Sequence, residues 1–586
     1  MLESTTPLDS PDAGHRGQLG DFALIASLCL VLFLAGNGRV SLWDRDEAWY
    51  AETAREMWTS GDYIVPRFNA EPRFRKPVLI YWLMAGAYSV FGDNEFGARF
   101  FSGVAGTVTC LLTYRLGTRM GGRAMGLAAG LMLAVCPMML VESRMATTDA
   151  TLTAALTGAM LCLWELHAAG PSRRWSLGFW FLIGVAMLTK GPIGPGLVAL
   201  AVAVWCLLSR QILVLRRLNW IAGVPLALCV VIPWGVAIYV VTNGEFFRYV
   251  IHHEALAHSL GVMEHHSGFP GFYLVIAGLG LFPWSLALGI ALAGAWRWAR
   301  QNGPELFLVG WIVGPLVVLE LMRSKLPHYC LPTVPAWSLL IARGLVEFRA
   351  AGKWLTQSTR GWIRLATFVL PGTTASTVLA WLALNWAPEP VRVPLLAVAG
   401  VMFGGGVVAV LCCIARRDLW AWSAMVCTSW CVGLLAAGWV LPRADGVRVA
   451  HAAAEALQGK ATATETPIAL FGFREPSLVF YIGEPVPSFN SLKQLNAFLD
   501  EHPAFVTLLR EPDVKRLKEY TNVQVELCER IDAQPIRGIM AESAYVARIT
   551  SAGTQSEIEA ARVAPVDPEQ PERPAETDRS TIPLER

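Results

Sequence analysis

The segment after the first long apolar stretch places acidic residues where they could act on a hydroxyl group. Asp44, Asp46 and Glu47 follow one another almost without interruption. Charged groups beside a membrane span are costly unless they face water or a functional site. A carboxylate within reach of a hydroxyl can act as a general base, so Asp46 and Glu47 are candidate catalytic residues. The alternative is a solvated juxtamembrane cluster, although Trp43 and Trp49 flank these charges.

Basic residues lie at the end of the same segment and in other loops of the same predicted face. A group of cations can hold a phosphate and neutralise the charge that it develops as a leaving group. The candidate phosphate-binding residues are Arg75, Lys76, Lys190, Arg323 and Lys325. For Lys190 the alternative is a side chain that snorkels to the membrane interface. For Arg323 and Lys325 the alternative is a chance exception to the rule that basic loops stay in the cytoplasm.

Two further residues are predicted to line the cavity between these loops. Asp149 stands at the start of an apolar stretch, after a polar segment that begins at Glu142. Tyr329 follows Lys325 in its loop. Asp is also a favoured N-cap residue, so capping of the following helix would alone explain Asp149 equally well.

Histidines gather in the loop from about residue 242 to 269, which carries five of the protein's 10 His. Imidazole together with carboxylate suits zinc and similar ions. His265 and His266 are therefore candidate metal ligands, and a divalent metal is a candidate cofactor. The spacing matches no compact zinc pattern, and a solvated loop is the alternative. No nucleotide cofactor is predicted, because the chain has neither a P-loop nor a dinucleotide-binding fingerprint.

A bundle of membrane helices must position these residues. Of the 586 residues, 54% are hydrophobic and only 16% are charged. This composition excludes a disordered protein and argues against a soluble enzyme, and a net charge of +2 gives no indication of a nucleic-acid partner. Apolar stretches long enough to cross the lipid bilayer follow one another along the chain. They cover approximately residues 22–38, 78–92, 99–117, 124–141, 150–169, 175–189, 192–208, 218–241, 270–295, 304–322, 328–346, 362–386, 391–414 and 418–440.

The distribution of Arg and Lys predicts how these stretches are oriented. Short loops rich in Arg and Lys stay in the cytoplasm, and here they come at every second connection from Arg115 onward. This alternation works with a cytoplasmic N-terminus if 78–92, which is short and opens on Pro77, lies in the interface as a helix. About 13 transmembrane helices remain. The loop 39–77 and everything after residue 441 then lie outside, which in a bacterium is the periplasm beside the inner membrane.

The predicted fold is therefore an α-helical polytopic membrane protein with a C-terminal periplasmic α/β domain. Residues 1–21 are predicted to be a disordered cytoplasmic tail, and 22–441 the transmembrane domain. Residues 446–549 form the α/β domain, because strand-like runs alternate with helical ones there. The runs predicted as strands are Ile468 to Phe473, Phe505 to Leu509, Val523 to Leu527 and Ala544 to Ile549. Residues 550–586, rich in Pro, Glu, Arg and Thr, are predicted to be disordered.

Several motifs in the loops resemble those of the lipid-carrier-dependent glycosyltransferases of the GT-C architecture. The similarity includes the aminoarabinose transferases that modify lipid A and the protein O-mannosyltransferases. It covers roughly residues 20 to 345, and the layout of spans and α/β domain extends it to about 549. The motifs are Asp46-Glu47-Ala48-Trp49-Tyr50-Ala51-Glu52, Gly61-Asp62-Tyr63-Ile64-Val65-Pro66, Arg75-Lys76-Pro77, Phe96-Gly97-Ala98-Arg99, Thr189-Lys190-Gly191-Pro192 and Lys325-Leu326-Pro327-His328-Tyr329.

The resemblance implies a role for individual residues. Asp46 would take the proton of the acceptor or orient the acceptor, Lys76 would bind the carrier phosphate, and Asp149 would be a second acidic residue of the cavity. One position departs from the lipid A transferases, which carry a Glu associated with a metal where this chain has Arg75. The sequence therefore does not identify the sugar or settle the metal.

Together these observations predict an inverting glycosyltransferase at the periplasmic face of the inner membrane. It would move a sugar from a polyprenyl-phosphate carrier to a lipid or protein acceptor. The alternative is a polytopic transporter or lipid flippase, which would place ionisable residues in the middle of spans and often repeat a pair of broken helices. A third hypothesis is a sensor that reads ligands through the C-terminal domain, in which case deletion of residues 446–586 would remove all function.

Overall fold

The structure is a computed structural model. It describes residues 11–43, 46–252, 268–300, 303, 305–350, 359–445, 450–472, 475–520, 523–531 and 544–551. The chain divides into two compact units. The first contains Met1–Glu455, Glu475–Val486 and Asp532–Glu542, and the second contains Ala456–Arg474, Pro487–Ile531 and Ser543–Arg586.

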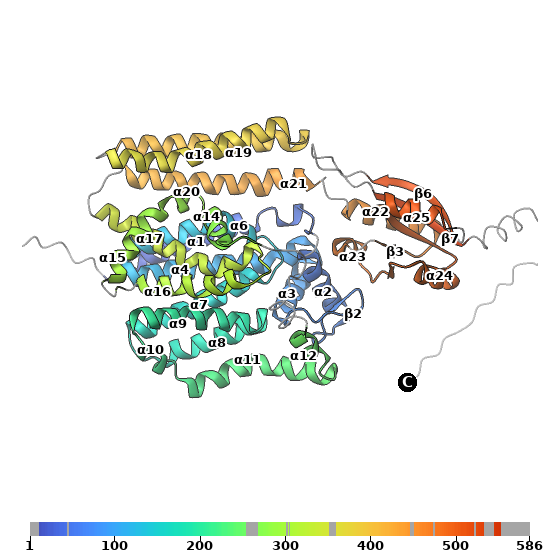
Figure 1. The fold of residues 1–586 in the computed structure, drawn as a ribbon, viewed down its shortest axis with the longest axis horizontal. Helices are drawn as coiled ribbons and strands as arrows, with labels where there is room; N and C mark the ends of the chain where they lie inside the picture. The colour runs from blue at the N-terminus through green and yellow to red at the C-terminus, as the bar shows by residue number, and fades with distance from the viewer. Residues whose placement is uncertain are drawn as a thin grey trace, which may run out of the picture. The chain divides into compact units, whose positions relative to one another are not determined.

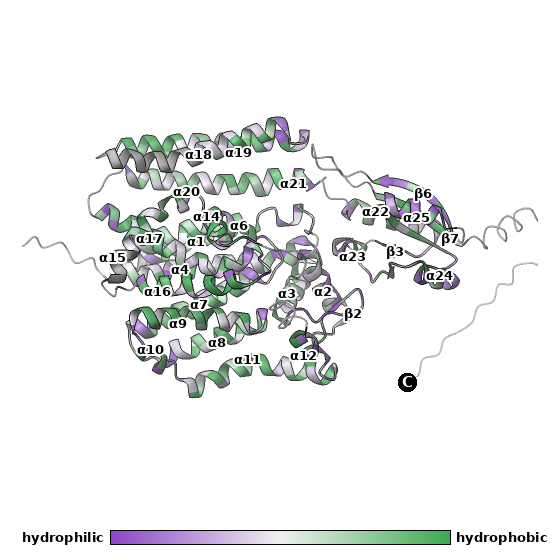
Figure 2. Ribbon diagram, in the orientation of Figure 1, coloured by the Kyte–Doolittle hydropathy of each residue, from purple (hydrophilic) through white to green (hydrophobic). Residues whose placement is uncertain are grey.

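The first unit consists mainly of long helices that lie roughly parallel to one another (Figure 1). Most of their residues are apolar (Figure 2). These helices are α1 (Pro11–Leu34), α4 (Glu95–Gly121), α5 (Arg123–Val135), α7 (Asp149–Ala168), α8 (Arg173–Lys190), α9 (Ile193–Ser209), α11 (Trp220–Val241), α15 (Leu288–Arg300), α16 (Glu305–Leu321), α17 (Val334–Ala350), α18 (Thr359–Asn385), α19 (Glu389–Ile414) and α20 (Asp418–Leu435).

Shorter elements connect the long helices or extend their ends. They are η1 (Asn37–Arg39), α6 (Pro137–Glu142), α10 (Leu213–Arg216), α12 (Glu245–Tyr249), α14 (Phe272–Gly280), η3 (Trp284–Ala287), η4 (Pro327–Thr333), the π-helical turn η5 (Ala436–Val440) and α21 (Leu441–Ala444). Helix α22 (Ala450–Thr464) contains the boundary between the two units, which lies after Glu455. Every apolar stretch predicted from the sequence is wholly or largely helical in the part of the chain that the structure describes.

Helix α4 lies at the centre of the bundle, where it packs against α1, α5 and α7. A second tight contact joins α9 and α16, because small residues let their backbones approach. A Cβ atom added at Gly310 would lie 2.7 Å from the backbone nitrogen of Trp205, and one added at Gly314 would lie 2.5 Å from the carbonyl oxygen of Leu200. A larger residue at either glycine would therefore force the two helices apart.

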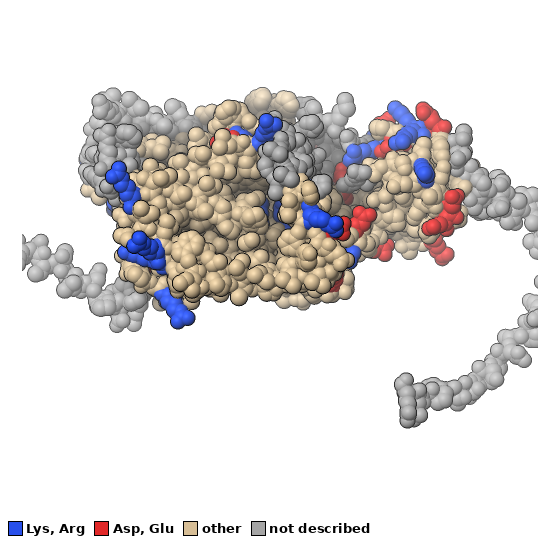
Figure 3. All heavy atoms as spheres, turned by 60° about the horizontal axis from the view of Figure 1, so that its bottom comes forward, with Lys and Arg blue, Asp and Glu red and all other residues tan. Residues whose placement is uncertain are grey.

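Six helices among the described residues are long and apolar enough to cross a membrane. A seventh candidate is the bent pair formed by Phe272–Gly280 and Trp284–Gly294, whose two parts meet at 113°. In Figure 3 the flank of the first unit is a broad surface with few charged residues, and Lys and Arg gather at the end where α9 and α10 meet. The chain is thus a helical protein with several candidate membrane spans.

The segment between α1 and α4 forms a small compact structure of its own. It contains α2 (Glu47–Ser60), a short hairpin of β1 (Arg67–Phe68) and β2 (Glu71–Pro72), and α3 (Leu79–Phe91). One face of α2, with Ala51 and Ala54, is fully buried and packs against α3. Gly61 ends α2 with a φ of 73°, a conformation that glycine adopts without strain. This packing fixes the start of α2, and with it the acidic cluster.

The second unit is a small α/β structure. Strands β5 (Ala504–Arg510), β7 (Ala544–Ser551) and β6 (Val523–Ile531) form an antiparallel sheet in that order. Strands β3 (Leu470–Phe471) and β4 (Ser488–Phe489) form a parallel pair. Helices α24 (Leu492–Glu501) and α25 (Glu511–Lys518) complete the unit, whose core includes Phe471, Phe505 and Ile549. Strands β5, β6 and β7 include the predicted runs Phe505 to Leu509, Val523 to Leu527 and Ala544 to Ile549, whereas the predicted run Ile468 to Phe473 is a strand only at Leu470–Phe471 among the described residues.

The structure differs from the prediction at two boundaries. Helix α1 begins at Pro11, so residues 11–21 are helical where the sequence predicts a disordered tail. Asp21 explains the ordered end, because its carboxylate accepts hydrogen bonds from Arg123 and Tyr114. The second difference is α23 (Pro476–Ile482), which belongs to the first unit although it lies within the predicted C-terminal domain.

Candidate active site

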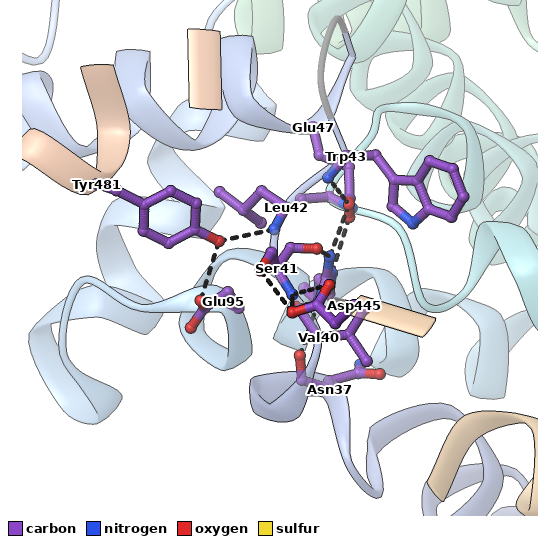
Figure 4. Close-up of polar contacts among 11 residues, drawn as sticks. Asn37, Val40, Ser41, Leu42, Trp43, Glu47, Glu95, Asp445 and Tyr481 are labelled. Carbon is purple, nitrogen blue, oxygen red and sulfur yellow. Dashed lines mark hydrogen bonds and ion pairs between the residues drawn. The ribbon is translucent and has the colours of Figure 1, made fainter. Parts of the chain in front are cut away.

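Glu47 is held in the protein interior by hydrogen bonds to both of its carboxylate oxygens (Figure 4). The guanidinium of Arg99 donates from Nε to Oε1 at 2.8 Å and from Nη2 to Oε2 at 2.7 Å. The backbone amides of Trp43 and Ala146 donate to the same carboxylate at 2.9 and 2.7 Å. Burial would raise the pKa of Glu47, but the charge and hydrogen bonds of Arg99 outweigh it and lower this pKa below its ordinary value. Glu47 is therefore an ionised, fully bonded anchor.

Asp46 immediately precedes α2 and is exposed, in contrast to Glu47. It interacts electrostatically with Tyr50 in α2, with Glu142 at the end of α6 and with His328 in η4. Three separate parts of the chain therefore lie within electrostatic range of this carboxylate.

Asp149 and Lys190 form an ion pair within electrostatic range of His328. Asp149 is the first residue of α7 and Lys190 the last residue of α8, and Nζ of the lysine lies 2.7 Å from Oδ1 of the aspartate. Both side chains are largely buried. Nζ of Lys190 also lies 5.0 Å from the ring centroid of Tyr329, a cation–π distance. The N-cap of α7 is Thr148, so Asp149 serves to pair with Lys190 and does not cap the helix.

His328 connects these groups electrostatically. It interacts with Asp149 and Lys190 of the ion pair, and also with Asp46 and Lys76. One histidine is thus within electrostatic range of an exposed carboxylate, two lysines and an aspartate that come from four segments of the chain. This arrangement can take a proton from a hydroxyl and stabilise a phosphate next to it.

The remaining predicted cations lie in different environments. Arg75 and Arg323 are exposed. Lys325 is buried, and its Nζ donates to the carboxylate of Glu320 and to the carbonyl oxygen of Phe269, the latter at 3.2 Å. Glu320 in turn accepts hydrogen bonds from the backbone of the α14 region. Lys325 thus joins the end of α16 to α14 through these bonds.

His265 and His266 lie outside the described residues. In the part of the chain that the structure describes, no three His, Cys, Asp or Glu side chains group in a way that could hold a metal ion.

Arg73 is an element of the site that the sequence analysis did not single out. Its guanidinium lies 4.9 Å from the ring centroid of Trp49 and 5.4 Å from that of Tyr50. It also donates a hydrogen bond of 2.9 Å to the hydroxyl of Tyr81. Arg73 follows strand β2 and Trp49 lies in helix α2, so only the folded structure reveals this stack. The two aromatic residues beside Asp46 were the available signal, because Arg often packs on such rings.

Comparison with known proteins identifies relatives over most of the chain. Residues 75–236 match the family model described as dolichyl-phosphate-mannose-protein mannosyltransferase. An undecaprenyl phosphate-alpha-4-amino-4-deoxy-L-arabinose arabinosyl transferase of Pseudomonas aeruginosa is 33% identical over 428 residues, 71% of this chain and 74% of the relative. A protein of the same name from Aeromonas salmonicida is 29% identical over 71% of this chain and 76% of the relative.

A solved structure shows the same fold. The crystal structure of ArnT from Cupriavidus metallidurans bound to undecaprenyl phosphate has a TM-score of 0.72 to this chain, with 24% identity. The match covers 90% of this chain and 98% of that one. The identity to the Pseudomonas aeruginosa relative, over most of both chains, shows that the chain belongs to the undecaprenyl phosphate-alpha-4-amino-4-deoxy-L-arabinose arabinosyl transferases, a family of membrane glycosyltransferases.

Proposed function

We propose that the chain is an inverting glycosyltransferase that moves a sugar from a polyprenyl-phosphate carrier to a lipid or protein acceptor at the periplasmic face of the inner membrane. The observation that carries this proposal is the position of the exposed Asp46 carboxylate. Through His328 it shares one electrostatic environment with Lys76 and with the ion pair of Asp149 and Lys190. The names of the relatives support undecaprenyl phosphate as the carrier.

In the proposed reaction Asp46 takes the proton from the acceptor hydroxyl as the hydroxyl oxygen attacks the anomeric carbon of the sugar. The bond between that carbon and the carrier phosphate oxygen breaks, and the phosphate leaves with the electron pair. Lys76 and Lys190 stabilise the charge that develops on the leaving phosphate, and the exposed Arg75 and Arg323 add to the positive potential. A single displacement of this kind inverts the configuration at the anomeric carbon. Glu47 keeps the start of α2 in place.

The topology is part of the proposal. Residues 22–441 form the transmembrane domain with about 13 spans, and the N-terminus lies in the cytoplasm. Residues 446–549, except for α23 in the first unit, form a periplasmic α/β domain, and residues 550–586 follow it as a tail. The gathering of Lys and Arg at one end of the first unit supports this orientation (Figure 3).

The transporter or flippase alternative is not favoured. Asp149 is the first residue of α7 and Lys190 the last residue of α8, so these charges sit at helix ends and not in the middle of spans. The family is one of transferases.

The proposal is tested by replacing Asp46 and Lys76 in the full chain. Asp46→Asn removes the base and Lys76→Ala removes a phosphate ligand, and we expect each variant to insert normally and to lose transfer. Mass spectrometry of lipid-linked sugars, lipid A and periplasmic glycoproteins, in cells with and without the gene, identifies donor and acceptor through the accumulated polyprenyl-phosphate sugar. Near-normal transfer by both variants would overturn the proposal.

A further inference from the structure

The backbone of residues 40–43 is irregular, and side chains that are distant in sequence satisfy several of its hydrogen-bonding groups (Figure 4). Arg99 of α4 donates to the carbonyl oxygens of Asn37, Val40 and Ser41 at 2.7, 2.6 and 2.9 Å. Loop backbone groups that are buried need such partners, because no ladder or helix supplies them. Arg99 therefore fixes the carbonyl groups of this loop.

Asp445 fixes the same loop through its amide groups. Its carboxylate accepts from the backbone nitrogen of Ser41 at 3.1 and 3.2 Å and from the Ser41 hydroxyl at 2.6 Å. Asp445 follows α21, which continues the helical run of α20 and η5. The end of that helical run thus contacts Ser41, which precedes it by about 400 residues in the sequence.

Tyr481 of α23 fixes the next residue. Its hydroxyl accepts from the backbone nitrogen of Leu42 at 2.8 Å and donates to Oε1 of Glu95, the first residue of α4, at 3.0 Å. Leu42 itself is 1% exposed. Two consecutive amides of the loop are therefore bonded by side chains that come from the last part of the sequence.

We propose that Asp445 and Tyr481 are positioning residues of the transferase, which hold the loop of residues 40–43 so that the Asp46 carboxylate reaches the acceptor hydroxyl. This inference rests on the proposed role of Asp46. Displacement of a catalytic group by about 1 Å can cost on the order of 100-fold in rate, even when the altered residue lies away from the chemistry. The C-terminal part of the chain is then required for turnover, although none of the proposed reacting groups comes from it.

The attachment of α23 does not depend on the Tyr481 hydroxyl alone. Arg55 of α2 donates to the carbonyl oxygen of Gly483, and the side-chain amide of Asn69 makes two hydrogen bonds to the backbone of Val486 at 2.8 and 2.6 Å. Phe480 is 6% exposed and packs in the core beside α2. Removal of the hydroxyl therefore frees the Leu42 amide while α23 stays in place.

The test is Tyr481→Phe in the full chain, reconstituted in lipid vesicles with the polyprenyl-phosphate sugar extracted from cells that lack the gene. We expect kcat to fall about 10-fold to 100-fold. The affinity for undecaprenyl phosphate, measured with that lipid alone, should stay unchanged, and the thermal midpoint should fall only modestly, because the buried Leu42 amide loses one hydrogen bond. Asp445→Asn, which weakens the bonds to Ser41, should act in the same way. Tyr520→Phe is the matched control, because that hydroxyl also accepts a hydrogen bond, of 2.6 Å from Asn496, but within the second unit.

A double substitution separates positioning from stability. In Asp46→Glu, whose carboxylate is already displaced, the added Tyr481→Phe should cost less than about 3-fold, because residues that act through one another are not additive. The same fold loss of kcat in both backgrounds would overturn the positioning role. So would an equal fold loss of affinity for undecaprenyl phosphate, or a thermal midpoint so low that unfolded protein accounts for the lost activity. Full activity of Asp46→Asn would instead refute the proposed function, whatever Tyr481→Phe does.

Discussion

Glu47 and Arg99 form an ion pair in which both side chains are almost completely buried, with 0% and 3% exposure and an Nη2–Oε2 distance of 2.7 Å. Arg99 is in the long helix α4 and Glu47 begins α2, so this pair joins the segment between α1 and α4 to the helix bundle. The neighbouring carboxylate of Asp46 is exposed. Of these two adjacent acidic residues, Glu47 thus holds the loop and Asp46 faces the candidate site.

Breaking this buried pair should be strongly destabilising. Glu47→Gln leaves the Arg99 charge without its partner in the interior, and the expected loss is about 3 to 5 kcal/mol in the free energy of unfolding. The measurement is thermal or denaturant unfolding of the purified protein in detergent. Glu389→Gln is the control, because its pair with Arg392 is largely exposed and should contribute less than about 1 kcal/mol. Equal stability of Glu47→Gln and the wild type would contradict the structural role.

The ion pair of Asp149 and Lys190 should matter for donor binding. Lys190→Met is expected to weaken binding of undecaprenyl phosphate at least about 10-fold, because a cation next to the leaving phosphate is lost. Lys190→Met alone also leaves the Asp149 charge buried without its partner, which should lower stability. Asp149→Asn combined with Lys190→Met removes both charges, so it should restore stability without restoring binding of undecaprenyl phosphate. Binding is measured by titration of the purified protein, with Lys518→Ala, an exposed lysine of α25, as the control. Unchanged affinity in Lys190→Met would remove this residue from the phosphate site.

The free energy of unfolding should depend on pH through Glu52, which lies in α2. Burial raises the pKa of Glu52 from 4.5 to about 7, even though Arg55 bonds both of its oxygens. The folded state therefore binds a proton that the unfolded state releases above pH 4.5. The resulting stabilisation is full below pH 4.5 and is lost as the pH rises to about 7, a change of about 3 kcal/mol.

This dependence is checked by thermal unfolding at pH 5 and pH 8. Glu52→Gln should flatten the difference between the two conditions, because it has no proton to release. Glu511→Gln, an exposed glutamate of the second unit, should leave the difference as it is in the wild type. A wild type that is equally stable at both pH values would show that Glu52 is ionised throughout.

The proposed topology is tested with single cysteines in a variant that lacks the native ones. Ser60→Cys, at the exposed end of α2, should react with a membrane-impermeant maleimide in intact spheroplasts. Gln211→Cys, exposed between α9 and α10, should react only after the membrane is permeabilised. The reverse pattern would invert the orientation, and labelling of both sites in intact spheroplasts would disprove the proposed span count between them.

Apolar periodicity and length were enough to predict the helices of the first unit, because burial in lipid imposes continuous apolar stretches. Loop chemistry was enough to select Asp46, Lys76, Asp149 and Lys190, because charges are scarce and those near spans stand out. Their roles in catalysis and phosphate binding stay predictions. The sequence did not predict that Glu47 is buried while Asp46 is exposed, since this difference depends on Arg99, which is distant in sequence. It did not predict that α23 belongs to the first unit either, because the residues that α23 contacts are also distant in sequence.

The return of α23 to the first unit has a consequence for biosynthesis. Residues 40–46 leave the ribosome among the first, but the tyrosine that bonds the Leu42 amide is made only when most of the chain is complete. A chain that stops before residue 475 would lack the hydroxyl that bonds the Leu42 amide, and by the proposed role of Tyr481 its Asp46 would not be positioned for transfer. Prematurely ended chains would therefore occupy the membrane without consuming lipid-linked sugar, and the enzyme would become competent only as its synthesis nears its end.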